Sequence, residues 1–123
     1  MTDYEDSRVL VADEPIKSGE TKTLSFTIGG DASLSGATFK FTLSDQSGEN
    51  ALFSLEGTEG DSDTGQWDFS GIDSSGRVAT VTLTPTETAQ TPDWYFGEVK
   101  ITYSGGAVEK SPDLKIEIQR AIT

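Results

Sequence analysis

Apolar and polar residues alternate along most of the chain, which is the pattern of β-strands with one buried face. The clearest segments are Leu24–Ile28, Thr38–Leu43 and Ala79–Leu83, where every second residue is apolar. Two more segments alternate toward the C-terminal end, Gly97–Tyr103 and Leu114–Gln119. Residues that favour turns separate them, mainly Gly, Asp, Ser and Pro. The pattern predicts an all-β chain.

Shorter segments complete this prediction. Arg8–Ala12 and Leu52–Leu55 are apolar enough for short strands, and Trp67 and Phe69 alternate within the Gly- and Asp-rich stretch 57–76. We interpret that stretch as a hairpin excursion. Together these segments predict a β-sandwich of about seven to eight antiparallel strands.

The same pass along the chain predicts one helical turn and a single domain. Thr84 is a suitable cap and Pro85 suits the first helical position, so a turn of helix is expected from Thr86 to Ala89. We expect residues 1–16 to form an N-terminal arm and first strand, and residues 17–123 to form the sandwich.

The charge of the chain limits its functions. It has 21 Asp and Glu against 9 Lys and Arg, which gives −12, and it has no His or Cys. A Ser-His-Asp triad, a Cys nucleophile, a structural zinc site and a disulfide are therefore excluded. The negative charge speaks against nucleic acid and anionic membranes as partners. It is also typical of a protein working in high salt, as in a halophilic host, the alternative being an ordinary acidic surface.

The feature most like a metal site is the run from Asp61 to Gly65, which includes Asp63 and is followed by Asp68. Alternating Asp residues can supply oxygen ligands to calcium. A calcium-binding EF-hand loop would need Glu at its twelfth position, where this chain has Ile72. Asp and Gly are also common in solvated turns, so we expect no cofactor, with a calcium site as the alternative.

Pairs of carboxylates are the remaining candidates for catalysis. Glu56 with Glu59, or Asp93 with Glu98, could in principle form a glycosidase pair. Accidental pairs are unavoidable in so acidic a chain, and a general acid also needs an apolar pocket to raise its pKa. We therefore expect no enzymatic activity.

Aromatic residues are the candidates for binding. Tyr95 falls in phase with Gly97, so Trp94 and Phe96 are expected on the opposite face of that strand. An apolar patch on an outer face usually marks a protein partner, and we favour this over a sugar. Trp67 fits either a contact of this kind or an anchor in the core.

The order of these elements resembles a known family. The motifs are Ser18-Gly19-Glu20-Thr21, Leu34-Ser35-Gly36-Ala37, Asp45-Gln46-Ser47-Gly48, Gly76-Arg77-Val78-Ala79, Trp94-Tyr95-Phe96-Gly97-Glu98, Gly105-Gly106 and Lys110-Ser111-Pro112, with alternating strands between them. This succession, over residues 17–119, resembles the N-terminal domain of the baseplate upper proteins of tailed phages, which is an immunoglobulin-like β-sandwich.

The resemblance implies a structural protein of a tailed-virus virion, in the baseplate or tail, the neck or the capsid decoration. Its partners would be other virion proteins and copies of itself in a homo-oligomer. We expect contacts at the N-terminal arm with Tyr4, at Trp67, Trp94 and Phe96, and at the 57–76 stretch. The acidic start of the chain is unlike a signal peptide, so we expect synthesis in a host cytoplasm.

The alternative function is a carbohydrate-binding or adhesin module that recognises a host surface glycan. It would use the ring of Trp67, Trp94 or Tyr95 as a stacking platform.

Overall fold

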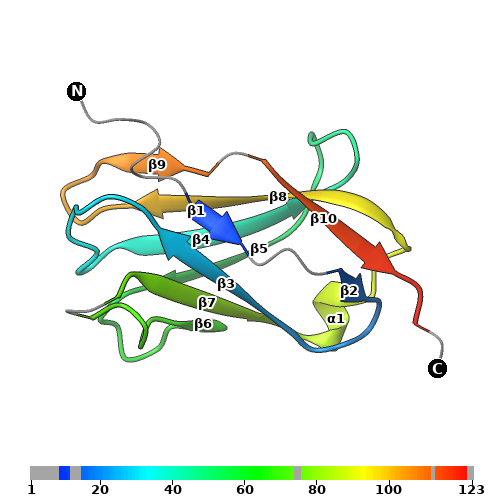
Figure 1. Cartoon of the computed structure of the whole chain (residues 1–123), viewed down its shortest axis with the longest axis horizontal. Coiled ribbons are helices and arrows are strands. Elements are labelled where there is room, and N and C mark those ends of the chain that lie inside the picture. Colours follow the sequence, from blue (N-terminus) through cyan, green and yellow to red (C-terminus); the bar gives the residue numbers. More distant parts are fainter. Residues whose placement is uncertain (1–8, 12–14, 74–75, 112, 122–123) are drawn as a thin grey trace.

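The structure is a computed structural model that describes residues 9–11, 15–73, 76–111 and 113–121 (Figure 1). Its elements are β1 (Val9–Val11), β2 (Ile16–Lys17), β3 (Lys22–Ile28), β4 (Thr38–Ser44), β5 (Ala51–Thr58), β6 (Trp67–Asp68), β7 (Val78–Leu83), α1 (Pro85–Thr88), β8 (Asp93–Thr102), β9 (Val108–Lys110) and β10 (Leu114–Gln119). The expectation of an all-β sandwich is confirmed.

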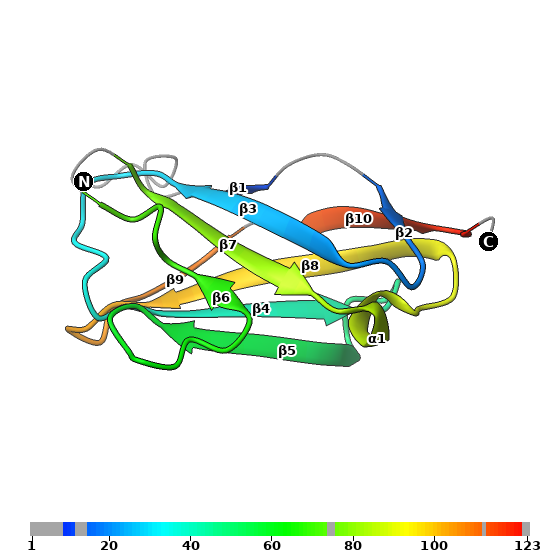
Figure 2. The same cartoon turned by 90° about the horizontal axis from the view of Figure 1, so that it is seen from below.

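The strands form two sheets that pack face to face (Figure 2). One sheet has the order β1-β3-β7-β6, and the other has the order β2-β10-β8-β4-β5, with β9 paired to β8. Apart from β2, which is an additional strand beside β10, these orders match the A-B-E-D and G-F-C-C′ sheets of a variable-type immunoglobulin domain. The immunoglobulin-like arrangement therefore follows from the pairing of the strands.

The pairing differs from the expected all-antiparallel set at one place. β2 runs parallel to β10, with Ile16 opposite Ile118 and Lys17 opposite Gln119. Ile16, the last residue of the segment expected to form the N-terminal arm and first strand, is buried in the core. The alternation did not reveal β2 or β9, because strands of two and three residues are too short to show a period.

Alternation fixes which side chains fill the space between the sheets. In β4 the buried residues are Phe39, Phe41 and Leu43, and in β7 they are Ala79, Val81 and Leu83. In β8 they are Tyr95, Gly97, Val99 and Ile101. Every one of these positions has the phase that the sequence predicted.

Trp67, on the edge strand β6, packs into this core with 3 % of its surface exposed. Its ring centroid is 5.8 Å from that of Phe26 on one sheet and 5.5 Å from that of Phe39 on the other. It also stacks on Phe69 at 5.7 Å. The indole N–H donates to the carbonyl of Leu55 at 2.9 Å, so the only polar atom of the side chain is satisfied.

The end of the sandwich opposite β9 is closed by α1 and the start of β8 (Figure 1). Tyr95 donates its hydroxyl hydrogen to the carbonyl of Thr91, the tyrosine corner of immunoglobulin-type folds. The predicted helical turn is confirmed, with Pro85 at its start. Burial raises the pKa of Glu87, but hydrogen bonds from the N–H and hydroxyl of Thr84 and from Gln66 outweigh it, so the pKa lies below its usual value.

The 57–76 stretch does more than the expected hairpin. Residues 59–66 carry the chain from β5 in one sheet to β6 in the other. Only the second part of the stretch is a hairpin. It leads from β6 back to β7, and a bridge between Ile72 and Arg77 closes it. The crossing passes very close to Gly57, where an added Cβ would lie 2.6 Å from the carbonyl oxygen of Thr64 and 3.0 Å from the Cβ of Trp67. Glycine is required there by space.

This close approach gives a stability prediction. The variant Gly57→Ala is expected to lower the free energy of unfolding by about 1–3 kcal/mol, because the new methyl group must displace backbone. The matched control is Gly105→Ala, since a Cβ at Gly105 meets nothing within 4 Å. Urea denaturation of both variants checks this, and equal stability of the two would contradict the packing described here.

Candidate interaction face

The solvent side of the six-stranded sheet, here called the outer face, carries the side chains that alternate with the core. Its residues are Lys17 on β2, Lys40, Thr42 and Ser44 on β4, Ser54 and Glu56 on β5, Trp94, Phe96, Glu98, Lys100 and Thr102 on β8, Val108 and Lys110 on β9, and Lys115, Glu117 and Gln119 on β10. No helix of the described chain covers it, since α1 lies at the end of the sandwich.

The aromatic end of the outer face lies at the start of β8. Trp94 is 46 % exposed, and Phe96 beside it is half-buried. The ammonium group of Lys115 lies 4.9 Å from the centroid of the Trp94 ring, a cation–π contact. The structure thus places Trp94 and Phe96 on the outer face, as the phase of the strand predicted.

The other aromatic candidates are not available on the surface. Trp67 is 3 % exposed and Tyr95 is 5 % exposed, so neither ring presents a face to a partner or a sugar. For Trp67 the core role is the one the structure supports, because its alternation with Phe69 points both rings between the sheets. Tyr4 and residues 1–7 of the expected N-terminal arm lie outside the described residues.

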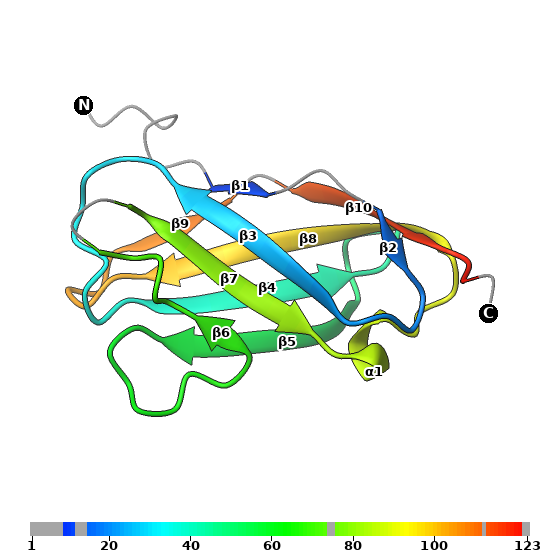
Figure 3. The ribbon, with the colours of Figure 1, turned by 60° about the horizontal axis from the view of Figure 1, so that its bottom comes forward.

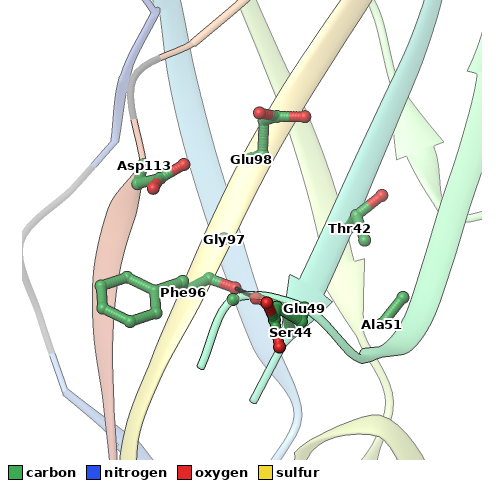
Figure 4. A pocket seen from close by; sticks show the side chains of 9 residues that line it. Thr42, Ser44, Glu49, Ala51, Phe96, Gly97, Glu98 and Asp113 are labelled. Atoms are coloured by element: carbon green, nitrogen blue, oxygen red, sulfur yellow. Dashed lines mark hydrogen bonds between the residues drawn. The ribbon is translucent and has the colours of Figure 1, made fainter. Parts of the chain in front are cut away.

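A shallow hollow of about 190 Å³ lies next to Phe96 (Figure 4). Hydroxyl and carboxylate side chains line much of it. These are Thr42, Ser44, Glu49, Glu98 and Asp113. The hydroxyl of Ser44 donates to the carbonyl of Phe96 at 3.2 Å. The hollow is smaller than the roughly 300–1,000 Å³ of most ligand pockets, and none of its lining side chains is basic.

The other end of the outer face carries a row of like charges. Lys40 of β4 lies directly opposite Lys100 of β8, and Lys100 lies directly opposite Lys110 of β9. We call these three residues the lysine row. On β5 the row ends at Glu56, opposite Lys40. No residue of the row makes an ion pair with another described residue.

The lysine row was missed from the sequence because Lys40 is far from Lys100 in the chain and Lys110 lies on a strand that the alternation did not reveal. Each occupies an outward position of its own strand, but only the register of β4, β8 and β9 brings them together. Lys22, on β3, is the only lysine outside the outer face. The face therefore holds most of the positive charge of a strongly acidic chain.

The metal candidates Asp61, Asp63 and Asp68 belong to local turns. An oxygen of Asp63 accepts the N–H of Gly65, and an oxygen of Asp68 accepts the N–H of Ser70. The hydrogen bonds from Ser70 hold the pKa of Asp68 below its usual value. Within the described residues, no group of three carboxylates comes together that could hold a metal ion.

Asp45 organises the turn beside the hollow. One of its oxygens accepts the hydroxyl and the N–H of Ser47, at 2.5 and 3.1 Å, and the other accepts the amide of Asn50 at 2.8 Å. The side-chain hydrogen bonds from Ser47 and Asn50 are the main causes that lower the pKa of Asp45 to about 2.

No protein-family model matches the chain, and no curated protein matches it significantly. The resemblance to baseplate upper proteins therefore stays a prediction. In the part of the chain that the structure describes, no helix has the length and apolar character to cross a membrane.

The lysine row gives a second stability prediction. Like charges directly opposite each other destabilise a sheet, whereas opposite charges stabilise it. The variant Lys100→Glu removes two repulsive pairs and places a carboxylate between Lys40 and Lys110. We expect a gain of about 0.5 kcal/mol in the free energy of unfolding at low salt. Denaturation at two salt concentrations checks this, and an unchanged or lower stability at low salt would contradict it.

The turn at Asp45 gives a pH prediction. Its pKa is about 2 in the folded chain and about 3.9 in an unfolded one. The carboxylate therefore contributes stability above about pH 4, and this contribution is lost as the pH falls toward 2. The variant Asp45→Asn should lose less stability between pH 5 and 2 than the parent chain. An NMR titration of the side-chain carboxyl carbon checks the pKa itself, and a midpoint near 4 would contradict it.

Proposed function

We propose that this chain is a structural, non-enzymatic protein of a tailed-virus virion that works through contacts with copies of itself and with other virion proteins. The baseplate or tail, the neck and the capsid surface are its candidate places. The proposal takes the implication of the family resemblance and joins it to one observation on the molecule, the exposed aromatic end of the outer face.

That observation favours a protein partner. Trp94 is nearly half exposed beside Phe96 and has charged neighbours, Lys115 and Glu117. Trp is among the residues that contribute most to protein–protein binding when it becomes buried, and a polar rim around such a residue excludes water from the contact. The patch thus has the composition of a contact centre.

The sheet edges support the same proposal. β5 pairs with β4 on one side only and forms the edge of the larger sheet. The half of this edge that lies away from the Trp67 indole, around Leu52 and Phe53, is able to accept a strand from a neighbour. A sandwich with a contact face and an edge suits assembly by repetition.

The alternative, a glycan-binding module, is favoured by the hollow beside Phe96. Hydroxyl and carboxylate groups around an aromatic ring can hydrogen-bond to sugar hydroxyls. Of the rings proposed as platforms from the sequence, Trp94 is the one that the structure leaves exposed. The two functions therefore differ in what covers Trp94.

Light scattering tests the proposed function. We expect the purified chain to form a discrete oligomer that strengthens from low to multi-molar salt, as salt screens the charge of −12. The variant Trp94→Ser should weaken this oligomer at least tenfold. The control Leu52→Ser should not, because it removes another exposed apolar side chain but keeps the backbone groups of the β5 edge.

Tryptophan fluorescence separates the two functions. Since Trp67 is buried, a change in emission reports mainly on Trp94. A shift on self-association supports the virion protein. A monomer whose emission shifts only when host glycans are added, with the shift absent in Trp94→Ser, overturns it in favour of the glycan-binding module.

A further inference from the structure

The arrangement of charge on this molecule is strongly uneven. From residue 41 to residue 76 the chain has eight Asp and Glu and no Lys or Arg. This region includes β5, at the edge of the larger sheet, and the crossing segment 59–66 that follows it. In the crossing segment, Asp61 and Asp63 are exposed, and we call this pair the acidic pair.

The lysine row lies on the three strands next to β5 in the same sheet. Figure 3 shows β9, β8, β4 and β5 in succession, with the crossing segment beyond β5. The three lysines lie on the first three of these strands. One molecule thus presents a positive surface on its outer face and a negative surface past its edge.

The lysine row costs stability in the isolated chain. Lys100 has a lysine opposite it on both sides, in a protein where acidic residues outnumber basic ones 21 to 9. An acid at this position would turn two repulsive pairs into attractive ones. A row of like charges without ion pairs to other described residues is what a docking surface for an anionic partner requires.

We propose that the lysine row binds the acidic pair, Asp61 and Asp63, of a second copy of this chain. The inference rests on the proposed function, because it names the surfaces through which copies would repeat. The two surfaces are different, so a pair of copies still has one free lysine row and one free acidic pair. Contacts of this head-to-tail type close into rings or continue as filaments.

The size of the row fits a short acidic loop. Neighbouring strands lie about 4.8 Å apart, so the backbone positions of Lys40 and Lys110 are about 10 Å apart across β8. Two carboxylates separated by one residue, about 6–7 Å at most between Cα atoms, lie within this span. A long polyanion fits less well, because it would also meet the net charge of −12 around the row.

Three variants of matched charge test the proposal. Lys40→Gln with Lys100→Gln removes two charges from the row, and Asp61→Asn with Asp63→Asn removes two from the acidic pair. The asparagine at 63 keeps an oxygen that can accept the N–H of Gly65. The control, Lys17→Gln with Arg120→Gln, removes two positive charges near the other end of the sheet, where Lys17 lies opposite Gln119.

We expect sedimentation velocity to show at least a tenfold weaker self-association for the row variant and for the acidic-pair variant, but not for the control. A mixture of the first two variants should form a one-to-one dimer that grows no further. In this mixture, the native row of one variant meets the native acidic pair of the other, and the remaining surfaces are neutralised. Thermal unfolding of each variant shows that the fold is kept.

Two results overturn the inference. One is an oligomer that both double variants leave unchanged. If that oligomer still depends on Trp94, the proposed function stands and only the surfaces assigned here are wrong. The other is a parent chain that stays monomeric at every concentration and salt level. Failure of the proposed function has its own signature, the glycan-dependent change in Trp94 fluorescence.

Discussion

The packing of Trp67 between the two sheets is the interaction on which the rest of this structure depends. Immunoglobulin domains of antibodies join their sheets with a disulfide beside a buried tryptophan, and this chain has no cysteine. Here the indole contacts Phe26 on one sheet and Phe39 on the other, and its N–H holds the carbonyl of Leu55. Aromatic contacts and one hydrogen bond therefore connect the two sheets in a chain that has no disulfide to do so. The crossing segment is fixed by the same contact, because Trp67 directly follows it and packs against Gly57.

Because the core holds the two sheets together, the charge pairs on the outer face do not all need to be the ones that stabilise the sheet. A sheet is most stable when unlike charges face each other across strands. At the aromatic end the neighbouring side chains attract each other, since the ammonium group of Lys115 lies over the ring of Trp94. At the other end, Lys100 has a lysine on each side. Departures from local stability tend to collect at functional surfaces, so the lysine row is more informative about function than the larger number of acids elsewhere.

Most of the fold follows from alternation, and most of the candidate site does not. The phases of β4, β7 and β8 are readable in the sequence because each apolar position is repeated at least three times. β2 is set instead by β10, near the other end of the chain, and this pairing is parallel. β9 pairs with β8, the strand directly before it, but three residues are too few to show a period. The exposure of Trp94 follows from its phase against Tyr95. The burial of Trp67 does not, since two alternating aromatics in a Gly- and Asp-rich stretch fit a surface or a core equally well. The lysine row exists only through the register of β4, β8 and β9, which no single strand shows by itself.

The repulsion between acidic copies and the attraction of the lysine row for carboxylates are compatible, because the two interactions act over different distances. Repulsion between two copies, each with a charge of −12, extends over about 10 Å at 0.1 M salt and about 3 Å at 1 M. The attraction between a lysine and a carboxylate acts when the two groups are in direct contact. Salt screens this attraction less where water is excluded from the contact. Salt therefore removes the barrier to approach more effectively than it removes the contact itself. On the proposed function, copies of this chain would stay dispersed at low salt and assemble where salt is abundant or where a template holds them together. Its acidity would then be a condition on assembly, and the proposed contacts at the aromatic end and the lysine row would determine its geometry.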